Sequence, residues 1–323
     1  MKNTISKFQE IVNSEISKIK FDKTPKELYE PIKYIMQLKS KRFRPILTLM
    51  SYKLFKGDID KVIKPSIAIE FFHNFTLIHD DIMDGAEIRR GKKTIHKKWN
   101  NNIGILSGDL LMIFTYKMLE DLSKNNLKLV LKRFNEISIK VCEGQQYDMN
   151  YENINMIDEA KYLEMIKLKT AVLIGFSLEL GGIIADVDKK KSDILYQVGE
   201  YMGIGFQLKD DYLDVFGNEK FGKKIGGDIL LNKKTYLLIK LLELSNKKDM
   251  EKIDYWMNTI NNPIEKVKTI TSLMQKNKID LITKKKMKYY FKKGINLLDK
   301  ISANNKNLNI LSNYFEMMID RKI

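Results

Sequence analysis

The distribution of proline is the feature that most restricts how this chain can fold. The 323-residue sequence has no proline from Ser66 to Asn262, and its five prolines are Pro25, Pro31, Pro45, Pro65 and Pro263. Proline removes a backbone donor and clashes with the preceding helical turn, so a long proline-free run permits long uninterrupted helices. No convincing alternating strand pattern accompanies it. The sequence therefore predicts an all-α protein.

Apolar spacing and glycine positions divide the chain into candidate helices. These lie near residues 4–19, 25–38, 42–56, 60–84, 94–122, 127–150, 158–184, 190–216, 233–246, 248–260, 263–275, 278–300 and 305–320. The longest apolar stretch, Ala171 to Val187, contains Glu179 and predicts a buried helix rather than a membrane span. No linker or repeat interrupts the pattern, so residues 1–323 are expected to form a single domain.

The formal charge of +16 does not by itself indicate a nucleic-acid partner. The excess is nearly all lysine and is spread along the chain. The basic, aromatic segment from Lys284 to Gly294 is interpreted as a solvated helix face over a core stripe, and no nucleic acid is expected as a partner. The lone Cys142 and the lack of a signal-peptide apolar core favour a cytoplasmic protein without disulfides.

Arginine is rare in this lysine-rich chain, with six among 57 basic residues. Four of the six form two pairs, Arg42 with Arg44 and Arg89 with Arg90, and all three histidines lie in the same region. The guanidinium group offers a planar fork that binds phosphate or carboxylate through two bonds, which lysine does not. The pairs therefore indicate anion binding.

Two acidic clusters break local electrostatic rules in the same way. "DDIMD" runs from Asp80 to Asp84 and "DDYLD" from Asp210 to Asp214, and each ends an apolar helix shortly before a glycine. Aspartates at i and i+4 share a helix face and repel each other, and the helix dipole disfavours anions at that end. Carboxylate-only ligands favour a hard cation, and magnesium binds through one or two carboxylates together with substrate phosphates. The clusters therefore predict a magnesium-dependent diphosphate site.

These motifs resemble those of the trans-isoprenyl diphosphate synthases, also called polyprenyl synthetases. "DDIMD...RRG" is similar to their first aspartate-rich motif, "GFQLKDDYLD" with "FGKKIGGD" to their second, and "KRFRP" to their homoallylic-substrate motif. The resemblance extends from about residue 35 to residue 240, with the motifs in the family's order. It implies one helical bundle around a central cavity, the isoprenoid synthase fold, and a homodimer.

The resemblance implies a head-to-tail 1′-4 trans condensation of isopentenyl diphosphate with an allylic diphosphate. It assigns three Mg²⁺ ions to Asp80, Asp84 and Asp210, with Asp81, Asp211 and Asp214 as further candidate ligands. Thr170 and Gln207 would face the nascent cation, with Lys169 beside them. The allylic diphosphate would be bound by Arg89, Lys169, Lys223 and Lys233, and isopentenyl diphosphate by Lys41, Arg44, His73 and Arg90. One departure is Ser40, where the family usually has glycine before the lysine.

Product length is predicted from the residues that precede the first cluster. In the family, an aromatic residue five positions before the first aspartate, followed by a small residue, accompanies C20 products. Phe75 and Thr76 match this pattern and predict geranylgeranyl diphosphate, with the C15 farnesyl product or a longer chain as alternatives. On a straight helix, however, Thr76 and Phe72 lie closer to the face of Asp80 than Phe75 does, so Phe72 is a competing candidate for the floor of the cavity.

Two other classes remain as alternatives. A class I terpene cyclase also uses a DDxxD cluster and magnesium, but it has no site for a second substrate, which "KRFRP" and the second arginine indicate here. A non-catalytic synthase subunit normally loses one aspartate cluster, and both are intact in this sequence.

Overall fold

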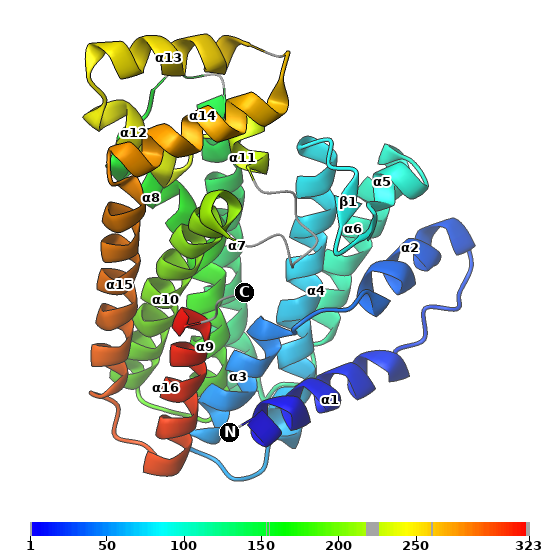
Figure 1. The fold of residues 1–323 in the computed structure, drawn as a ribbon. Helices are drawn as coiled ribbons and strands as arrows, with labels where there is room; N and C mark the ends of the chain where they lie inside the picture. The colour runs from blue at the N-terminus through cyan, green and yellow to red at the C-terminus, as the bar shows by residue number, and fades with distance from the viewer. Residues whose placement is uncertain (1, 153, 155, 218–225, 260, 321–323) are drawn as a thin grey trace. The chain divides into compact units, whose positions relative to one another are not determined.

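Long α-helices make up nearly all of the structure, as the proline distribution predicted. The computed structural model describes residues 2–152, 154, 156–217, 226–259 and 261–320 (Figure 1). Within these ranges the only β-strands form a two-stranded antiparallel ribbon, β1 (Ile88–Arg89) and β2 (Lys92–Lys93). The all-α prediction is confirmed. None of the described helices has the length and apolar character needed to cross a membrane.

The chain divides into two compact units, each assembled from separate stretches of sequence. The first comprises residues 1–135, 176–196 and 301–313, and the second comprises 136–175, 197–300 and 314–323. The helices wholly in the first unit are α1 (Lys2–Lys18), α2 (Lys26–Gln37), α3 (Phe43–Lys53), α4 (Asp60–Met83), α5 (Ile95–Lys98) and α6 (Asn101–Lys117). Because neither unit is one continuous stretch, no simple linker separates them, and the single domain stays a prediction.

The second unit holds the remaining short helices. It contains α8 (Glu159–Ile166), the π-helical turn η1 (Lys167–Ala171), α11 (Gly227–Leu230), α12 (Tyr236–Leu244), α13 (Lys247–Asn258), α14 (Pro263–Lys276) and α15 (Ile279–Leu298). Four helices contribute residues to both units: α7 (Lys124–Glu152), α9 (Val172–Ile184), α10 (Lys189–Phe216) and α16 (Asn305–Asp320). In Figure 1, α13 and α14 lie across the end of α15.

Close packing of α6 against α4 fixes the helix that carries the first aspartate cluster (Figure 1). Two glycines one turn apart make this approach possible. A Cβ on Gly104 would lie 2.8 Å from Cδ1 of Ile82, and one on Gly108 would lie 2.4 Å from Nε2 of His79. These distances are shorter than ordinary carbon contacts, so a larger residue at either position would force the two helices or their side chains apart.

Aromatic side chains dominate the core around α4. Phe72 packs edge to face on Phe134, with ring centroids 5.0 Å apart, and Phe134 packs in turn on Phe176 at 6.1 Å. On the neighbouring side Phe71 contacts Phe21 and Phe114 at 6.3 and 6.0 Å. Such aromatic pairs contribute beyond the area they bury. The middle of α4 is therefore held rigidly within the first unit.

The sequence predicted a continuous helix over residues 94–122, and this prediction is wrong. α5 ends at Lys98, and α6 begins at Asn101 after a break. The break follows from Asn100, whose backbone is extended and whose side chain accepts a hydrogen bond from the Ile103 amide at 2.9 Å. Asparagine is among the best N-cap residues, so it starts a new helix rather than continuing the old one. Apolar spacing alone did not reveal this, because the spacing continues through the break.

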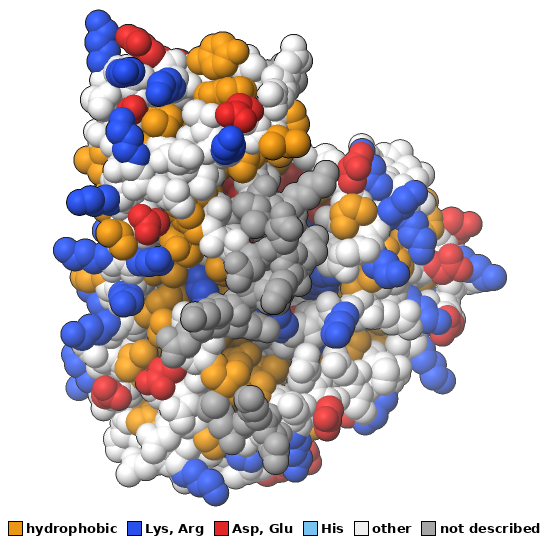
Figure 2. Space-filling model, viewed as in Figure 1, with side chains coloured by type: hydrophobic (Ala, Val, Ile, Leu, Met, Phe, Trp, Pro, Cys, Tyr) orange, Lys and Arg blue, Asp and Glu red, His pale blue; other side chains and the backbone are white. Residues whose placement is uncertain are grey.

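The basic segment of α15 has the arrangement that the sequence predicted. Met287, Phe291 and Gly294 are buried, whereas Lys284, Lys285, Lys288 and Lys292 are exposed. In Figure 2, Lys and Arg side chains lie singly or in small groups over the visible face, with Asp and Glu among them.

Candidate active site

The first aspartate cluster lies at the C-terminal end of α4, and its three carboxylates differ in burial. Asp84 is the C-cap and is exposed, Asp80 is half-buried, and Asp81 is only 2% exposed. Nε of Arg89 donates to both carboxylate oxygens of Asp81, at 2.8 and 2.7 Å. Burial raises the pKa of Asp81, and Arg89 opposes the shift. Asp81 is thus engaged within the protein, and Asp80 and Asp84 are the pair that share an accessible helix face.

These donors fit a hard divalent cation that completes its ligand set with substrate. Asp80 and Asp84 supply only carboxylate oxygens, at i and i+4 on the helix. Among the described residues, no three His, Cys, Asp or Glu side chains are placed to hold a metal ion by themselves. Magnesium is commonly bound by one or two carboxylates with waters and phosphate oxygens, so the donor set fits a metal that arrives with a diphosphate.

The two adjacent arginines sit on a tight hairpin that the sequence analysis did not predict. In β1 and β2, Arg89 pairs with Lys92, and Arg90 and Gly91 form the two-residue loop between the strands. Both loop residues have positive φ, 53° at Arg90 and 75° at Gly91. This is the combination that a type I′ hairpin turn requires. Left-handed backbone at a bulky residue such as Arg90 is uncommon and costly, and it is a frequent mark of functional sites.

The hairpin gives the two arginines different surroundings. Arg89 binds the aspartates of α4, whereas the charges that act on Arg90 include those of Glu70 and Arg42. Burial lowers the pKa of Arg90, Glu70 opposes this shift, and the guanidinium groups of Arg42 and Arg89 add to it. Asp81 also raises the pKa of Arg90, by less than Glu70 does, so the two arginines share part of their charge environment and differ mainly in their bonded partners.

The residues predicted to bind isopentenyl diphosphate form a cationic cluster in the first unit. Nη1 of Arg44 donates to Nε2 of His73 at 3.0 Å. A guanidinium group can only donate, so His73 is neutral and carries its proton on Nδ1. Burial, and then the charge of Arg44, lowers the pKa of His73 well below its usual value, and burial lowers that of Arg44 to about 10.

Two donors in this cluster lack partners within the described part of the chain. Nε of Arg44 and Nη1 of Arg90 are buried without a hydrogen bond. Buried, unsatisfied charged donors cost free energy, and the two groups also repel each other. Such an arrangement is stabilised by an anion with several acceptor oxygens. Lys41 is exposed in the turn just before α3.

The second aspartate cluster, near the end of α10 in the second unit, repeats the pattern of the first. Asp210 is exposed, whereas Asp211 is 4% exposed and accepts bonds from the hydroxyl of Tyr162 and from Nε2 of Gln207, the latter at 3.1 Å. Burial raises the pKa of Asp211 to about 7, with smaller contributions from Asp228 and Asp210. In both clusters, therefore, the second aspartate is buried and bound to protein groups.

Asp214, the last aspartate of this cluster, is hydrogen-bonded to the backbone at Asp228. Asp214 accepts a hydrogen bond from the amide of Asp228 at 3.0 Å. Lys233, predicted to bind the allylic diphosphate, is joined to the same segment because its amide donates to the carbonyl of Asp228 at 2.9 Å. Lys223, the other predicted lysine of this loop, lies outside the described residues.

The predicted catalytic residues Lys169 and Thr170 lie in the π-helical turn η1. The sequence predicted one uninterrupted helix over 158–184, and the π turn is a local departure from that prediction. Such turns insert an extra residue and are often found at functional sites. Here α7 passes so close that a Cβ on Gly144 would lie 2.2 Å from the amide nitrogen of Lys169.

Hydrogen bonds connect Thr170, through Gln207, to the buried aspartate of the second cluster. Oγ1 of Thr170 donates to Oε1 of Gln207 at 3.3 Å, and Gln207 donates in turn to Asp211. Nζ of Lys169 forms a 2.6 Å ion pair with Asp148 of α7. Sequence reasoning missed Asp148, because its only signal is a lone carboxylate on a polar helix. Contacts with other protein groups thus orient Lys169, Thr170 and Gln207.

The three candidates for the cavity floor differ in exposure. Phe72 is 1% exposed and surrounded by other rings, whereas Phe75 and Thr76 are half-buried. The ring of Phe75 lies 4.7 Å from that of His79, which is itself packed on Gly108. Phe75 and Thr76 therefore expose part of their surface, and Phe72 exposes almost none.

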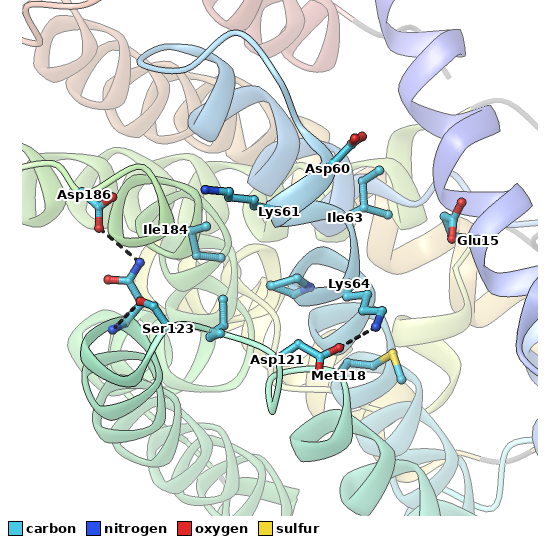
Figure 3. Close-up of a pocket in the computed structure, with 13 residues that line it drawn as sticks. Glu15, Asp60, Lys61, Ile63, Lys64, Met118, Asp121, Ser123, Ile184 and Asp186 are labelled. Atoms are coloured by element: carbon cyan, nitrogen blue, oxygen red, sulfur yellow. Dashed lines mark hydrogen bonds and ion pairs between the residues drawn. The ribbon is translucent and has the colours of Figure 1, made fainter.

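A separate pocket lies near the beginning of α4, far along the helix from the aspartates. Its volume is about 730 Å³, and Asp60, Lys64, Asp121 and Asp186 are among its lining residues (Figure 3). Asp60 and Asp80 are twenty residues apart, which corresponds to about 30 Å of helix. None of the predicted site residues lines this pocket. It is not the cavity that the sequence predicted for the substrates.

Comparison with known proteins places this geometry in context. Residues 25–274 match the polyprenyl synthetase family. The chain is 39% identical over 235 residues to a geranylgeranyl pyrophosphate synthase of Geoglobus acetivorans, covering 72% of this chain and 74% of that protein. It is 34% identical over 235 residues to a geranylfarnesyl diphosphate synthase of Aeropyrum pernix, covering 70% and 74%. A crystal structure of a geranylgeranyl pyrophosphate synthase superposes with a TM-score of 0.93 at 38% identity, over 99% of each chain.

Proposed function

The chain belongs to the polyprenyl synthetase family and is a trans-prenyltransferase, and from this premise we propose that it makes geranylgeranyl diphosphate. The reaction joins isopentenyl diphosphate head to tail to an allylic diphosphate. The observation that best supports a two-substrate reaction is the cationic cluster of Arg44, His73 and Arg90, with two buried donors that have no partner within the described residues. A class I terpene cyclase has no second diphosphate to place there.

The allylic diphosphate is assigned to the aspartate side of the hairpin. Arg89 lies against Asp80 and Asp81, and in the second unit Lys169 and Lys233 supply further positive charge. Lys223 is retained in this role from the resemblance. The difficult step is the loss of diphosphate from the allylic carbon, and stabilising charge on that leaving group is the main contribution these residues can make. We propose that both aspartate clusters act on this one leaving group.

A divalent metal is part of this proposal. The family depends on one, and bound to the diphosphate it would stabilise the negative charge that develops on the leaving group. We propose that the ion is Mg²⁺, three per active site, held by Asp80, Asp84 and Asp210. Asp81, Asp211 and Asp214 are hydrogen-bonded to protein groups. We therefore assign them mainly to holding Arg89, Gln207 and Asp228, respectively.

Thr170 and Gln207 are proposed to face the carbocation. Their oxygens carry partial negative charge and no full charge, so they can stabilise a cation without forming a bond to it. The hydrogen bonds from Thr170 to Gln207 and from Gln207 to Asp211 fix both orientations. The released diphosphate is the proposed base that removes the final proton.

Isopentenyl diphosphate is assigned to Lys41, Arg44, His73 and Arg90. It carries no metal in this proposal, so its charge must be met by side chains alone. The neutral His73 accepts a bond from Arg44, which leaves the other guanidinium donors for phosphate oxygens. The scarcity of arginine elsewhere in the chain is explained if bidentate phosphate binding is needed here.

Product length is proposed to be C20 because Phe75 and Thr76, the half-buried pair, match the family's C20 pattern. One relative is named geranylfarnesyl diphosphate synthase, so a C25 product is an alternative. Chromatography against size standards must exclude it.

A homodimer in the cytoplasm completes the proposal. An exposed apolar face on α6, formed by Ile105, Leu106, Ile113 and Tyr116, offers a surface suited to a second copy. Cys142, the lone cysteine, agrees with a reducing compartment. Sedimentation of wild type and of an Ile113→Asp variant tests the dimer, which the substitution is expected to weaken.

The reaction is tested by incubation with isopentenyl diphosphate, Mg²⁺ and each allylic primer in turn, followed by chromatography of the products. A C20 diphosphate is expected, and it should disappear when EDTA is added. The absence of any condensation product with every primer would refute the enzyme assignment.

A further inference from the structure

The turn before α3 is held in an unfavourable backbone conformation by a buried ion pair. Arg42 is the N-cap of α3, with φ 49° and ψ 40° in the left-handed region. A long side chain rarely adopts this conformation unless its surroundings require it. Lys41 and Arg44, which flank Arg42, are both assigned to isopentenyl diphosphate. The conformation of one residue therefore sets the direction of two substrate-binding side chains.

The guanidinium group of Arg42 forms hydrogen bonds to other protein groups and is not directed toward a substrate. Nη1 of Arg42 lies 2.7 Å from Oε1 of Glu70, and the two side chains are 4% and 2% exposed. Nη2 donates to the carbonyl of Met36, and Nε donates to Oδ1 of Asn13 at 3.0 Å. Removing one member of such a pair leaves a buried charge uncompensated, so the interaction strongly restrains the side chain. The guanidinium is used to hold the turn.

Ser40 joins the same network. Its hydroxyl accepts a bond from the amide of Arg42 at 3.3 Å and donates to Oε1 of Glu70 at 3.4 Å. Its carbonyl accepts a bond from Nε2 of Gln9 at 2.9 Å. Gln9 and Asn13 both lie on α1, so this N-terminal helix clamps the turn from outside. The serine that departs from the usual glycine thus has a defined structural use in this chain.

Glu70 links the turn to the opposite side of the cationic cluster. It lies on α4, three residues before His73, so both point from neighbouring positions on one helix. Arg44 approaches His73 at 3.0 Å one helical turn from the residue that binds Arg42.

We propose that Arg42 and Glu70, with Ser40 and the α1 residues Gln9 and Asn13, form a positioning assembly that sets Lys41 and Arg44 for the diphosphate of isopentenyl diphosphate. This inference rests on the proposed function, which assigns Lys41, Arg44 and His73 to that substrate. None of the hydrogen bonds described for the assembly involves Arg89, Lys169 or Lys233, so its loss should affect one substrate selectively.

Three mild substitutions test the assembly without removing the buried ion pair. Ser40→Ala removes only the hydroxyl, Ser40→Gly also frees the backbone, and Asn13→Ala removes the bond to Nε of Arg42. Each is expected to raise the KM for isopentenyl diphosphate about three- to ten-fold, the effect of losing one or two hydrogen bonds. The KM for the allylic substrate and kcat should stay within about two-fold of wild type.

Two further variants separate positioning from general stability. Asn13→Asp keeps an acceptor for Arg42 and should restore the KM for isopentenyl diphosphate to within about two-fold of wild type. Ser14→Ala changes the exposed neighbour of Asn13 on the same helix and serves as the matched control, with no expected change. A merely structural role would lower the melting temperature without this selectivity.

Binding of isopentenyl diphosphate alone, measured by calorimetry, separates this inference from the proposed reaction. Wild type that binds but does not condense would overturn only the reaction, and the variants should still bind three- to ten-fold more weakly. Equal affinity in wild type, Ser40→Ala and Asn13→Ala would overturn the positioning assembly. Equal rises in the Michaelis constants for isopentenyl diphosphate and for the allylic substrate would also overturn the positioning assembly. If wild type did not bind isopentenyl diphosphate, both the proposed reaction and the positioning assembly would be overturned.

Discussion

Replacing Phe75 by alanine should lengthen the product beyond C20, whereas changing Phe72 should mainly lower stability. Along α4, Thr76, Phe75 and Phe72 lie about 6, 7.5 and 12 Å from Asp80, at 1.5 Å of rise per residue. A straight helix favours Phe72 as the floor. The structure argues otherwise, because Phe72 is 1% exposed and its ring packs on Phe134 and Phe75 at 5.0 and 5.7 Å.

The expected stability costs differ because the two rings differ in burial. Phe72→Ala removes a fully buried ring and should cost about 3–5 kcal/mol. At about 2–4 °C per kcal/mol, this lowers Tm by roughly 6–20 °C. Phe75 is half-buried, so Phe75→Ala should cost about 1–2 kcal/mol, and its main effect is on the space below the allylic chain.

The assay combines chromatography of radiolabelled products with thermal unfolding of each variant. Phe75→Ala should give products longer than C20 with a small fall in Tm, and Thr76→Phe should shorten the product to C15. Phe72→Leu is the matched control, since it keeps an apolar side chain in the core and should still yield C20. The reasoning is refuted if Phe72→Leu lengthens the product while Phe75→Ala leaves it at C20.

The remaining predictions concern the charged residues. Arg90→Lys should raise the KM for isopentenyl diphosphate at least ten-fold through loss of bidentate contacts, and Arg89→Lys should instead raise that for the allylic substrate; identical kinetic patterns would contradict the separate roles. Asp80→Ala or Asp210→Ala should abolish turnover. Because each substitution removes a like charge, the Tm measured without metal should stay within about 1–2 °C of wild type or rise slightly. Near-normal turnover in either variant would disprove the metal assignment. Burial holds the folded-state pKa of His73 well below 6.5, so the folded protein binds this proton less readily than the unfolded chain does, and the free energy of unfolding falls as the pH drops below about 6.5. His73→Gln should therefore lose less Tm between pH 8 and pH 5 than wild type does. An equal loss by calorimetry would argue against a neutral buried imidazole.

Much of the candidate site could be proposed from the sequence because its chemistry violates local rules. Aspartates at i and i+4 at a helix C-terminus are unfavourable without a cation, and this signal needs no knowledge of the rest of the fold. Paired arginines in a lysine-rich chain are a similar signal of bidentate anion binding. Both signals are local in sequence, so they remain visible in one chain without its structure.

The differences among the aspartates of each cluster could not be predicted in this way. Asp81 is buried because a hairpin brings Arg89 back to it, and Asp211 because Tyr162 lies 49 residues earlier but in contact. Burial depends on which distant segments meet at a residue. The helical period places Asp80 and Asp84 on one face, but it does not say which carboxylate the surrounding protein will cover.

Sequence alone determined the helical class, the two acidic clusters and the family of this protein. The helical class and the acidic clusters follow from residue type and short-range spacing, through proline exclusion and the 3.6-residue period. The family was identified by the resemblance of the motifs to those of known synthases. The tertiary structure decided the π turn that carries Lys169 and the left-handed turn at Arg42. These depend on contacts with α7 and on Glu70, 28 residues further along the chain. A strained backbone is stable only when distant side chains hold it, and only the folded chain brings those side chains together.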